Sequence, residues 1–200
     1  MLDNQKTRAL ASNVIDPVAK AVLRIGITPN QVTVFCAIAV SAAVLSTWSS
    51  GKFILGLLLI LPLSIGDLLD GTMARMSGSS SALGGFLDSV LDRVTDAALV
   101  GSLLMWTISS HADFWVNMCG VIALASGGVV PYVRAKAESL NVPCKVGIME
   151  RGERALVVGI AALLAGLGVT SAISVAFAVL AFFNSVTVVQ RMTVVAQALR

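Results

Sequence analysis

Long apolar runs separated by short polar breaks fill the chain after residue 27. They predict six membrane-spanning helices, at about 31–48, 53–76, 83–108, 114–137, 151–167 and 171–195. The breaks hold turn-forming residues, such as the Gly/Ser stretch 77–81. Pro62 lies inside the second run and is expected to kink that helix, and Trp48 at the end of the first run is typical of a membrane interface. The pattern therefore predicts an all-α integral membrane protein.

The residues before the first long apolar run form a different pattern. Val14, Val18, Val22 and Ile25 recur at near-helical spacing, while basic side chains occupy other faces. A basic amphipathic helix of this kind lies in the membrane interface. The alternative is a solvated helix packed on the same protein, because amphipathicity alone does not separate the two. We expect two parts, an N-terminal interfacial helix over 1–27 and a six-helix domain over 28–200.

Composition and charge agree with a membrane protein and orient it. Of 200 residues, 56% are hydrophobic and 12% charged, against about 25% charged in a typical soluble domain. With six spans, both termini lie on one side, together with nearly all Lys and Arg residues outside the spans; the other side holds Lys52. The positive-inside rule then places both termini in the cytoplasm. We expect a multi-pass protein of the plasma (inner) membrane, with membrane lipids and no nucleic acid as partners.

Four carboxylates stand out within the second and third runs. Asp67 and Asp70 are spaced i, i+3, and Asp88 and Asp92 are spaced i, i+4, so each pair projects from one face of a helix. Ionisable side chains inside apolar spans mark functional sites, and four carboxylates together require cations. We therefore predict two bound divalent ions, Mg²⁺ first with Mn²⁺ as the alternative. A purely structural cluster satisfied by Arg75 and Arg93 is the other interpretation.

The residues beside these carboxylates are small. Gly71 and Ala74 share the face of the first pair, and Gly84 precedes Asp88 by one turn. Their short side chains leave room for a bulky ligand, and Gly71 allows close backbone approach. Arg75 offers a planar fork of donors to a phosphate group. This segment therefore predicts a phosphate-containing ligand held next to the metal ions, at the cytoplasmic end of the two helices.

The pattern D-L-L-D-G-T-M-A-R, followed after eight residues by G-G-F-L-D-S-V-L-D, resembles the signature of the CDP-alcohol phosphotransferases. The resemblance implies that an acceptor hydroxyl attacks the β-phosphorus of CDP-diacylglycerol, that CMP leaves, and that Asp92 is the general base. It also implies that the CDP-diacylglycerol site includes Asn30, Gln31, Val32, Thr33, Gly71, Ala74, Arg75, Ser81 and Gly84. For residues 30–33 and for Ser81, helix capping is the alternative role.

A cluster of cations lies at the cytoplasmic ends of the fourth, fifth and sixth predicted helices, and it indicates which kind of acceptor substrate the protein uses. Its members are Arg134, Lys136, Arg151, Arg154 and Arg191, and such a cluster beside a helix N-terminus suits an anionic acceptor. Anchoring to anionic lipid headgroups is the alternative. The runs Y-V-R-A-K-A-E-S and I-M-E-R-G-E-R resemble those of actinobacterial phosphatidylinositol phosphate synthases. That resemblance implies inositol 1-phosphate as the acceptor, phosphatidylinositol phosphate as the product, and a homodimer.

Two other functions remain open from the sequence. The first keeps the mechanism and takes glycerol 3-phosphate as the acceptor, making a phosphatidylglycerophosphate synthase, because both acceptors are anionic. The second is a divalent-cation transporter that uses the four aspartates as its ion site. Paired half-repeats and discontinuous helices would favour the transporter, and the sequence shows neither.

Overall fold

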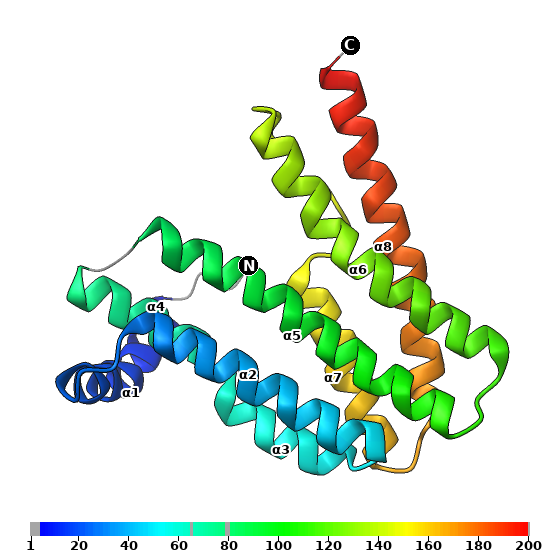
Figure 1. Cartoon of the computed structure of the whole chain (residues 1–200), viewed down its shortest axis with the longest axis horizontal. Coiled ribbons are helices and arrows are strands. Elements are labelled where there is room, and N and C mark those ends of the chain that lie inside the picture. Colours follow the sequence, from blue (N-terminus) through cyan, green and yellow to red (C-terminus); the bar gives the residue numbers. More distant parts are fainter. Residues whose placement is uncertain (1–4, 65, 79–80, 200) are drawn as a thin grey trace. The chain divides into compact units, whose positions relative to one another are not determined.

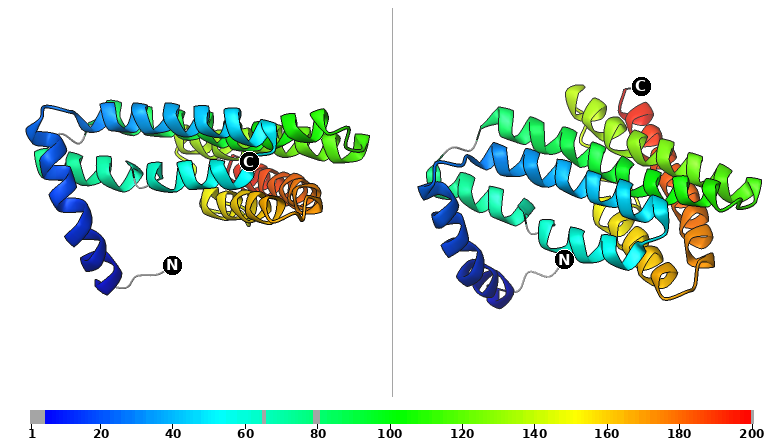
Figure 2. Two further views of the ribbon diagram at one scale, coloured as in Figure 1. Left: turned by 90° about the horizontal axis from the view of Figure 1, so that it is seen from below. Right: turned by 60° about the horizontal axis from the view of Figure 1, so that its bottom comes forward.

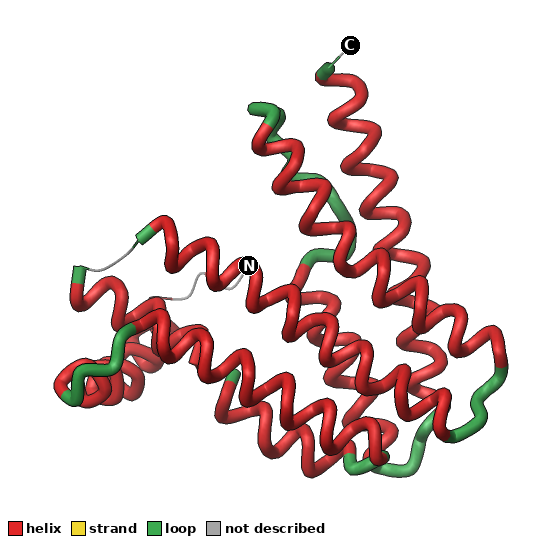
Figure 3. The backbone as a smooth tube through the Cα atoms, in the orientation of Figure 1, coloured by secondary structure: helices red, strands yellow, loops and turns green. Residues whose placement is uncertain are grey.

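The chain folds into helices joined by short connections. The computed structural model describes residues 5–64, 66–78 and 81–199; the side chains of residues 5–14 and of Asp67 lie outside that description. No strand occurs in the described part (Figure 3). The helices are α1 (Gln5–Arg24), α2 (Pro29–Thr47), the short 3₁₀ helix η1 (Trp48–Ser50), α3 (Phe53–Leu63), α4 (Gly66–Ser77), α5 (Ala82–Ser109), α6 (Phe114–Ser139), α7 (Arg151–Gly166) and α8 (Ser171–Ala198) (Figure 1).

The helices belong to two compact units. One unit contains the chain up to Ala42 together with Leu59–Thr95, and so includes α1, α4 and the first half of α5. The other contains Ala43–Leu58 and Asp96–Arg200, and so includes α6, α7 and α8. All four aspartates of the signature fall in the first unit, and all five cations of the predicted acceptor site fall in the second.

Among the residues that the structure describes, four helical segments are long and apolar enough to cross a membrane. They are Pro29–Ser50, Phe53–Ser77, Phe114–Ser139 and Ser171–Ala198. The predicted span over 83–108 corresponds to α5, which is long but carries Asp88, Asp92, Arg93 and Asp96 in and near its first half. The predicted span over 151–167 corresponds to α7, which has only 16 residues, fewer than the ~20 that a spanning helix typically needs. The all-α membrane fold is therefore confirmed with four candidate spans, while the count of six stays a prediction.

Helix α1 packs on α4 within the first unit. Ala19 is fully buried and forms an apolar cluster with Val32 of α2 and Met73 of α4. In the left view of Figure 2, α1 runs across the direction of α2 rather than along it. Val18 and Ile25 remain exposed. A helix that lies across a spanning helix, with apolar side chains left uncovered, is the arrangement that an interfacial helix needs, although it also packs on its own protein.

The second predicted span is broken rather than merely kinked. Helix α3 ends at Leu63, one residue after Pro62, and α4 begins at Gly66. Proline lacks the backbone N–H that a helix interior uses, which weakens the helix at this point. Gly66 is buried, and a Cβ there would overlap Cys36 Sγ of α2, so glycine is required for the close approach of these two helices. The break therefore gives the aspartate segment a helix of its own.

The second unit has a core of small and aromatic residues. Helix α8 packs on both α6 and α7. Gly120 of α6 lies against Leu104 and Phe177, where a Cβ would be only 2.8 Å from either side chain. Trp48 is fully buried and its Nε1 donates to the Phe53 carbonyl at 3.1 Å. Trp48 therefore packs inside the protein with its single polar atom satisfied, and its position at the depth of the membrane interface stays a prediction.

Candidate functional site

Asp70 is held in place by burial and by a hydrogen bond. It is buried on α4, and the hydroxyl of Thr33 on α2 donates to its Oδ2 at 2.5 Å. Leu69 beside it packs on the apolar cluster of Val32 and Met73. A carboxylate in such surroundings has few orientations available, because hydrogen bonding and packing both restrict it. Thr33, which is predicted to bind the nucleotide, therefore contacts a carboxylate of the predicted metal site directly.

The first turn of α2 also reaches the second half of the signature. Asn30 precedes Thr33 by one helical turn, and a Cβ on Gly84 of α5 would lie 3.1 Å from Asn30 Oδ1. Ser81 Oγ accepts a hydrogen bond from the Gly84 N–H at 3.0 Å and so caps α5. The structure thus brings Asn30, Ser81 and Gly84 together. Through Asn30 and Thr33, one turn of α2 lies against both α4 and α5, the two helices that carry the aspartate signature.

Two other members of the predicted nucleotide site have structural roles in this turn. The Gln31 side chain accepts a hydrogen bond from the Thr28 N–H at 2.9 Å, and the Gln31 N–H donates to Thr28 Oγ1 at 3.4 Å. This reciprocal pair is a capping box for α2. Val32 is buried in the core cluster with Ala19 and Met73. Their nucleotide contacts stay a prediction.

Arg75 lies at the exposed end of the signature on α4. Its Nη2 donates to Thr72 Oγ1 at 2.9 Å. A Cβ on Gly71 would lie 3.6 Å from Arg75 Nη1, so the guanidinium extends past the bare backbone of Gly71, one turn before it. Gly71 and the neighbouring Ala74 are half-buried. An exposed guanidinium beside a surface with almost no side chain suits a phosphate group that also contacts the backbone.

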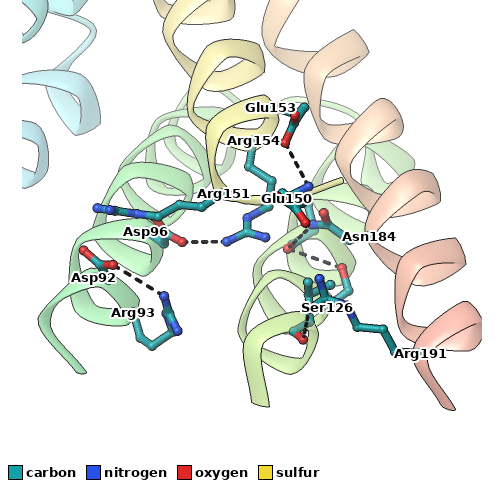
Figure 4. A network of polar contacts seen from close by, with 12 residues as sticks. Asp92, Arg93, Asp96, Ser126, Glu150, Arg151, Glu153, Arg154, Asn184 and Arg191 are labelled. Carbon is teal, nitrogen blue, oxygen red and sulfur yellow. Dashed lines mark hydrogen bonds and ion pairs between the residues drawn. The ribbon is translucent and has the colours of Figure 1, made fainter. Parts of the chain in front are cut away.

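The two aspartates on α5 differ in their surroundings. Asp88 is exposed, whereas Asp92 is half-buried and lies 3.6 Å from Arg93 Nη2 (Figure 4). This ion pair matches part of the structural alternative, in which arginines satisfy the carboxylates.

The donor set fits hard divalent cations. Carboxylate oxygens are the ligands that Mg²⁺ and Mn²⁺ prefer, and Thr33 fixes one of them at Asp70. Among the side chains that the structure describes, no three His, Cys, Asp or Glu groups gather as a metal site. The Asp67 side chain lies outside those described, so the convergence of all four aspartates stays a prediction.

Two of the predicted acceptor-site arginines meet at a third residue, Asp96. Arg154 Nη2 donates to Asp96 Oδ2 at 2.8 Å, and Arg151 Nε lies 3.7 Å from Asp96 Oδ1 (Figure 4). Both arginines belong to the first turn of α7, where the Glu150 N–H donates to Glu153 Oε2 at 3.0 Å. Sequence reasoning did not select Asp96 for any site. The sequence feature that could have indicated a role for Asp96 is its position one helical turn after Asp92, the last aspartate of the signature.

Arg191 is nearly fully buried, and its guanidinium donates hydrogen bonds to two backbone carbonyls. Its Nε donates to the Val146 carbonyl at 2.8 Å and its Nη1 donates to the Val130 carbonyl at 2.7 Å. It thereby ties the connection between α6 and α7 to α6 and α8. Arg191 belongs to the cationic cluster, and two of its donors are already used by backbone.

The remaining cations of the cluster lie on the surface of α6. Arg134 Nε pairs with Glu138 at 3.0 Å, and both side chains are substantially exposed. Lys136 is exposed as well. Exposed pairs at i, i+4 contribute little to stability, so Arg134 is available to exchange partners. Of the five predicted residues, the structure brings Arg151 and Arg154 together at Asp96, whereas the described contacts of Arg134 and Arg191 are with other partners.

Replacing Arg191 by alanine is expected to lower the unfolding temperature markedly. The change removes two hydrogen bonds from a charged donor, each typically contributing about 1.5–3 kcal/mol, and leaves the buried Val130 carbonyl and the partly buried Val146 carbonyl without their partner. Thermal unfolding of the detergent-solubilised protein measures the effect. Arg134→Ala is the matched control, since Arg134 is exposed and should change the unfolding temperature little. Equal unfolding temperatures in the two variants would contradict a stabilising role for the Arg191 hydrogen bonds.

Comparisons with known proteins agree with this geometry. A family model described as CDP-alcohol phosphatidyltransferase matches residues 26–198. The phosphatidylinositol phosphate synthase of Cutibacterium acnes is 38% identical over 200 residues, which cover 96% of each chain. The enzyme of the same name from Streptomyces avermitilis is 35% identical and is covered over 82% of its length, against 96% of this chain.

Solved structures give the same relationship in three dimensions. The crystal structure of Mycobacterium tuberculosis phosphatidylinositol phosphate synthase with CDP-DAG bound superposes with a TM-score of 0.85. It is 32% identical in sequence, and the match covers 92% of this chain and 94% of that one. The structure of the same protein in complex with manganese and citrate gives a TM-score of 0.84 at 32% identity, covering 91% and 88%.

Proposed function

The chain belongs to the CDP-alcohol phosphatidyltransferase family, and from this membership we propose that it transfers the phosphatidyl group of CDP-diacylglycerol to inositol 1-phosphate. The products are phosphatidylinositol phosphate and CMP. The observation that carries the proposal is the contact of one turn of α2 with both halves of the aspartate signature, through Thr33 and Asn30. Similarity to phosphatidylinositol phosphate synthases along almost the whole chain supports the choice of acceptor.

The first unit carries the residues for the nucleotide and the metal ions. We propose that the metal ligands are Asp67, Asp70, Asp88 and Asp92, and that they hold two Mg²⁺ ions, with Mn²⁺ as a substitute. Such ions stabilise negative charge on the attacking and leaving oxygens. Arg75 donates to a phosphate of the CDP group while the bare surface at Gly71 admits it. Asn30, Ser81 and Gly84 lie together where the cytidine portion would bind.

Asp92 is assigned the role of general base. It accepts the proton of the acceptor hydroxyl as that oxygen forms a bond to the β-phosphorus. The bond from the β-phosphorus to the bridging oxygen breaks, and CMP leaves with the electron pair. Arg93 Nη2 lies 3.6 Å from the Asp92 carboxylate and supplies positive charge beside it. Phosphoryl-type transfer depends mainly on such positioning and charge neutralisation.

We also propose the membrane arrangement predicted from the sequence. In it, residues 1–27 lie in the interface, residues 28–200 form the catalytic domain with six spans, and both termini and the site face the cytoplasm. The crosswise direction of α1 relative to α2 and its exposed Val18 and Ile25 support the interfacial position. The homodimer implied by the resemblance is part of the same proposal. A divalent-cation transporter is not retained, because the family is one of transferases.

The acceptor is tested directly with purified protein. Labelled CDP-diacylglycerol and Mg²⁺ are combined with inositol 1-phosphate, glycerol 3-phosphate or free inositol, and CMP and the lipid product are measured. We expect efficient turnover with inositol 1-phosphate and poor turnover with free inositol, since the latter leaves the cations unoccupied. Preference for glycerol 3-phosphate would make the protein a phosphatidylglycerophosphate synthase. Equal use of free inositol would contradict a phosphate site at the cationic cluster.

A further inference from the structure

Asp96 joins the two arginines that open α7. Each of its carboxylate oxygens faces a different guanidinium: Oδ2 accepts from Arg154 Nη2 at 2.8 Å, and Oδ1 lies 3.7 Å from Arg151 Nε (Figure 4). All three residues belong to the second unit. The closer contact is short and charge-assisted, so it fixes the position and orientation of the Arg154 guanidinium.

The burial of Arg154 makes this contact necessary. Only 9% of its side chain is exposed, whereas 42% of the Arg151 side chain is exposed. A buried guanidinium requires a partner, because it cannot lose its proton and its desolvation is otherwise uncompensated. The other end of the residue is fixed as well, since the Arg154 N–H donates to the Glu150 carbonyl at 3.2 Å in the first turn of α7. Both ends of Arg154 are therefore held in one position.

We propose that Asp96 is a positioning residue for the phosphate of the acceptor. It holds Arg154 through Nη2, and the remaining N–H groups of that guanidinium are left to face an anion. Arg151, which is more exposed, completes the pair of cations. The proposal rests on the proposed function, in which the cationic cluster receives a phosphorylated alcohol. Asp96 does not touch the substrate; it acts through Arg154.

The first measurement is the kinetics of Asp96→Asn with inositol 1-phosphate. The variant keeps the shape of the side chain and removes the charge that orients Arg154. We expect the acceptor KM to rise roughly ten- to a hundred-fold, and the KM for CDP-diacylglycerol to stay within about twofold. Asp96→Glu, which retains a carboxylate, should recover part of the acceptor affinity. Asp113→Asn is the matched control, since it removes the same charge just before α6 and should leave both KM values unchanged.

A double variant separates positioning from folding, because Asp96→Asn alone leaves a buried guanidinium without its counterion. Arg154→Met removes that guanidinium, and Arg154→Met/Asp96→Asn removes both charges. If Asp96 acts through Arg154, the acceptor KM of the double variant should lie within about threefold of that of Arg154→Met. A further rise of tenfold or more would overturn the proposal, as would a normal acceptor KM in Asp96→Asn. This comparison holds even if the single Asp96→Asn variant does not fold.

The test does not depend on the identity of the acceptor. The wild-type protein is first assayed with inositol 1-phosphate and glycerol 3-phosphate, and the variants are then compared with whichever is used. A wild-type preference for glycerol 3-phosphate would revise the proposed function and leave the assignment of Asp96 to be decided by the variants. Conversely, unchanged acceptor KM values in the Asp96 variants would reject the positioning role while the proposed reaction stands.

Discussion

Replacing any one of Asp67, Asp70, Asp88 and Asp92 by asparagine is expected to reduce turnover by on the order of a thousandfold, because each contributes a charged oxygen to the stabilisation of the transferred phosphate. The helices should remain folded, since asparagine keeps the size of the side chain. For Asp70, asparagine can still accept the hydrogen bond from Thr33 through its amide oxygen. The loss should therefore reflect the missing charge rather than a collapsed site.

Removal of metal ions should have the same effect on the unaltered protein. Treatment with EDTA is expected to abolish CMP release, and added Mg²⁺ should restore it. Asp113→Asn is a suitable control, because this aspartate precedes α6 and lies outside the signature. Calorimetric titration with Mn²⁺ provides a readout besides activity, with weaker binding expected in all four signature variants. Full turnover in a chelator-treated, metal-free sample would rule out the two-ion mechanism.

Asp92→Asn is expected to separate binding from chemistry. The three other aspartates can still hold metal, so the affinity for CDP-diacylglycerol should fall less than about tenfold. Turnover should fall by roughly a hundred- to ten-thousand-fold, the range typical of a lost general base. The Arg93 side chain, which lies 3.6 Å from Asp92, stays in place in this variant and keeps the local positive charge.

Two measurements on the same preparation decide this prediction. A titration with CDP-diacylglycerol gives the affinity, and single-turnover release of CMP gives the rate of the chemical step. Asp88→Asn is the comparison, since it removes a proposed ligand that has no assigned proton transfer and should weaken binding as well. If Asp92→Asn turns over at the normal rate, another group must accept the proton.

Helix boundaries could be predicted closely because local residues set them. The last helix was expected over 171–195 and extends over Ser171–Ala198, and the fourth was expected over 114–137 and extends over Phe114–Ser139. Ser81 was considered as a cap for the following helix, and its hydroxyl does accept the Gly84 N–H. Capping and turn formation involve residues three or four apart, so their pattern is visible in the sequence.

Contacts between distant segments could not be predicted in the same way. The partners of Asp96 lie 55 and 58 positions further along the chain, and the carbonyls that bind Arg191 precede it by 45 and 61 positions. Nothing in the spacing of these residues encodes such pairs, since only packing of the helices brings them together. Periodicity correctly marked the arginines as a cationic group. Periodicity could not show that Arg191 donates hydrogen bonds to backbone carbonyls or that Arg154 is buried.

The break after Pro62 has a consequence for the protein without its metal ions. Because α4 begins at Gly66, Asp67 and Asp70 fall within the first five residues of a separate helix. The first backbone N–H groups of a helix have no carbonyl partner within it, and they favour nearby negative charge by about 0.3–1 kcal/mol. An uninterrupted helix through residues 53–77 would surround these carboxylates with fully paired backbone instead. We therefore expect the metal-free protein to assemble with its aspartates in place, so that the ions are required for turnover and not for folding.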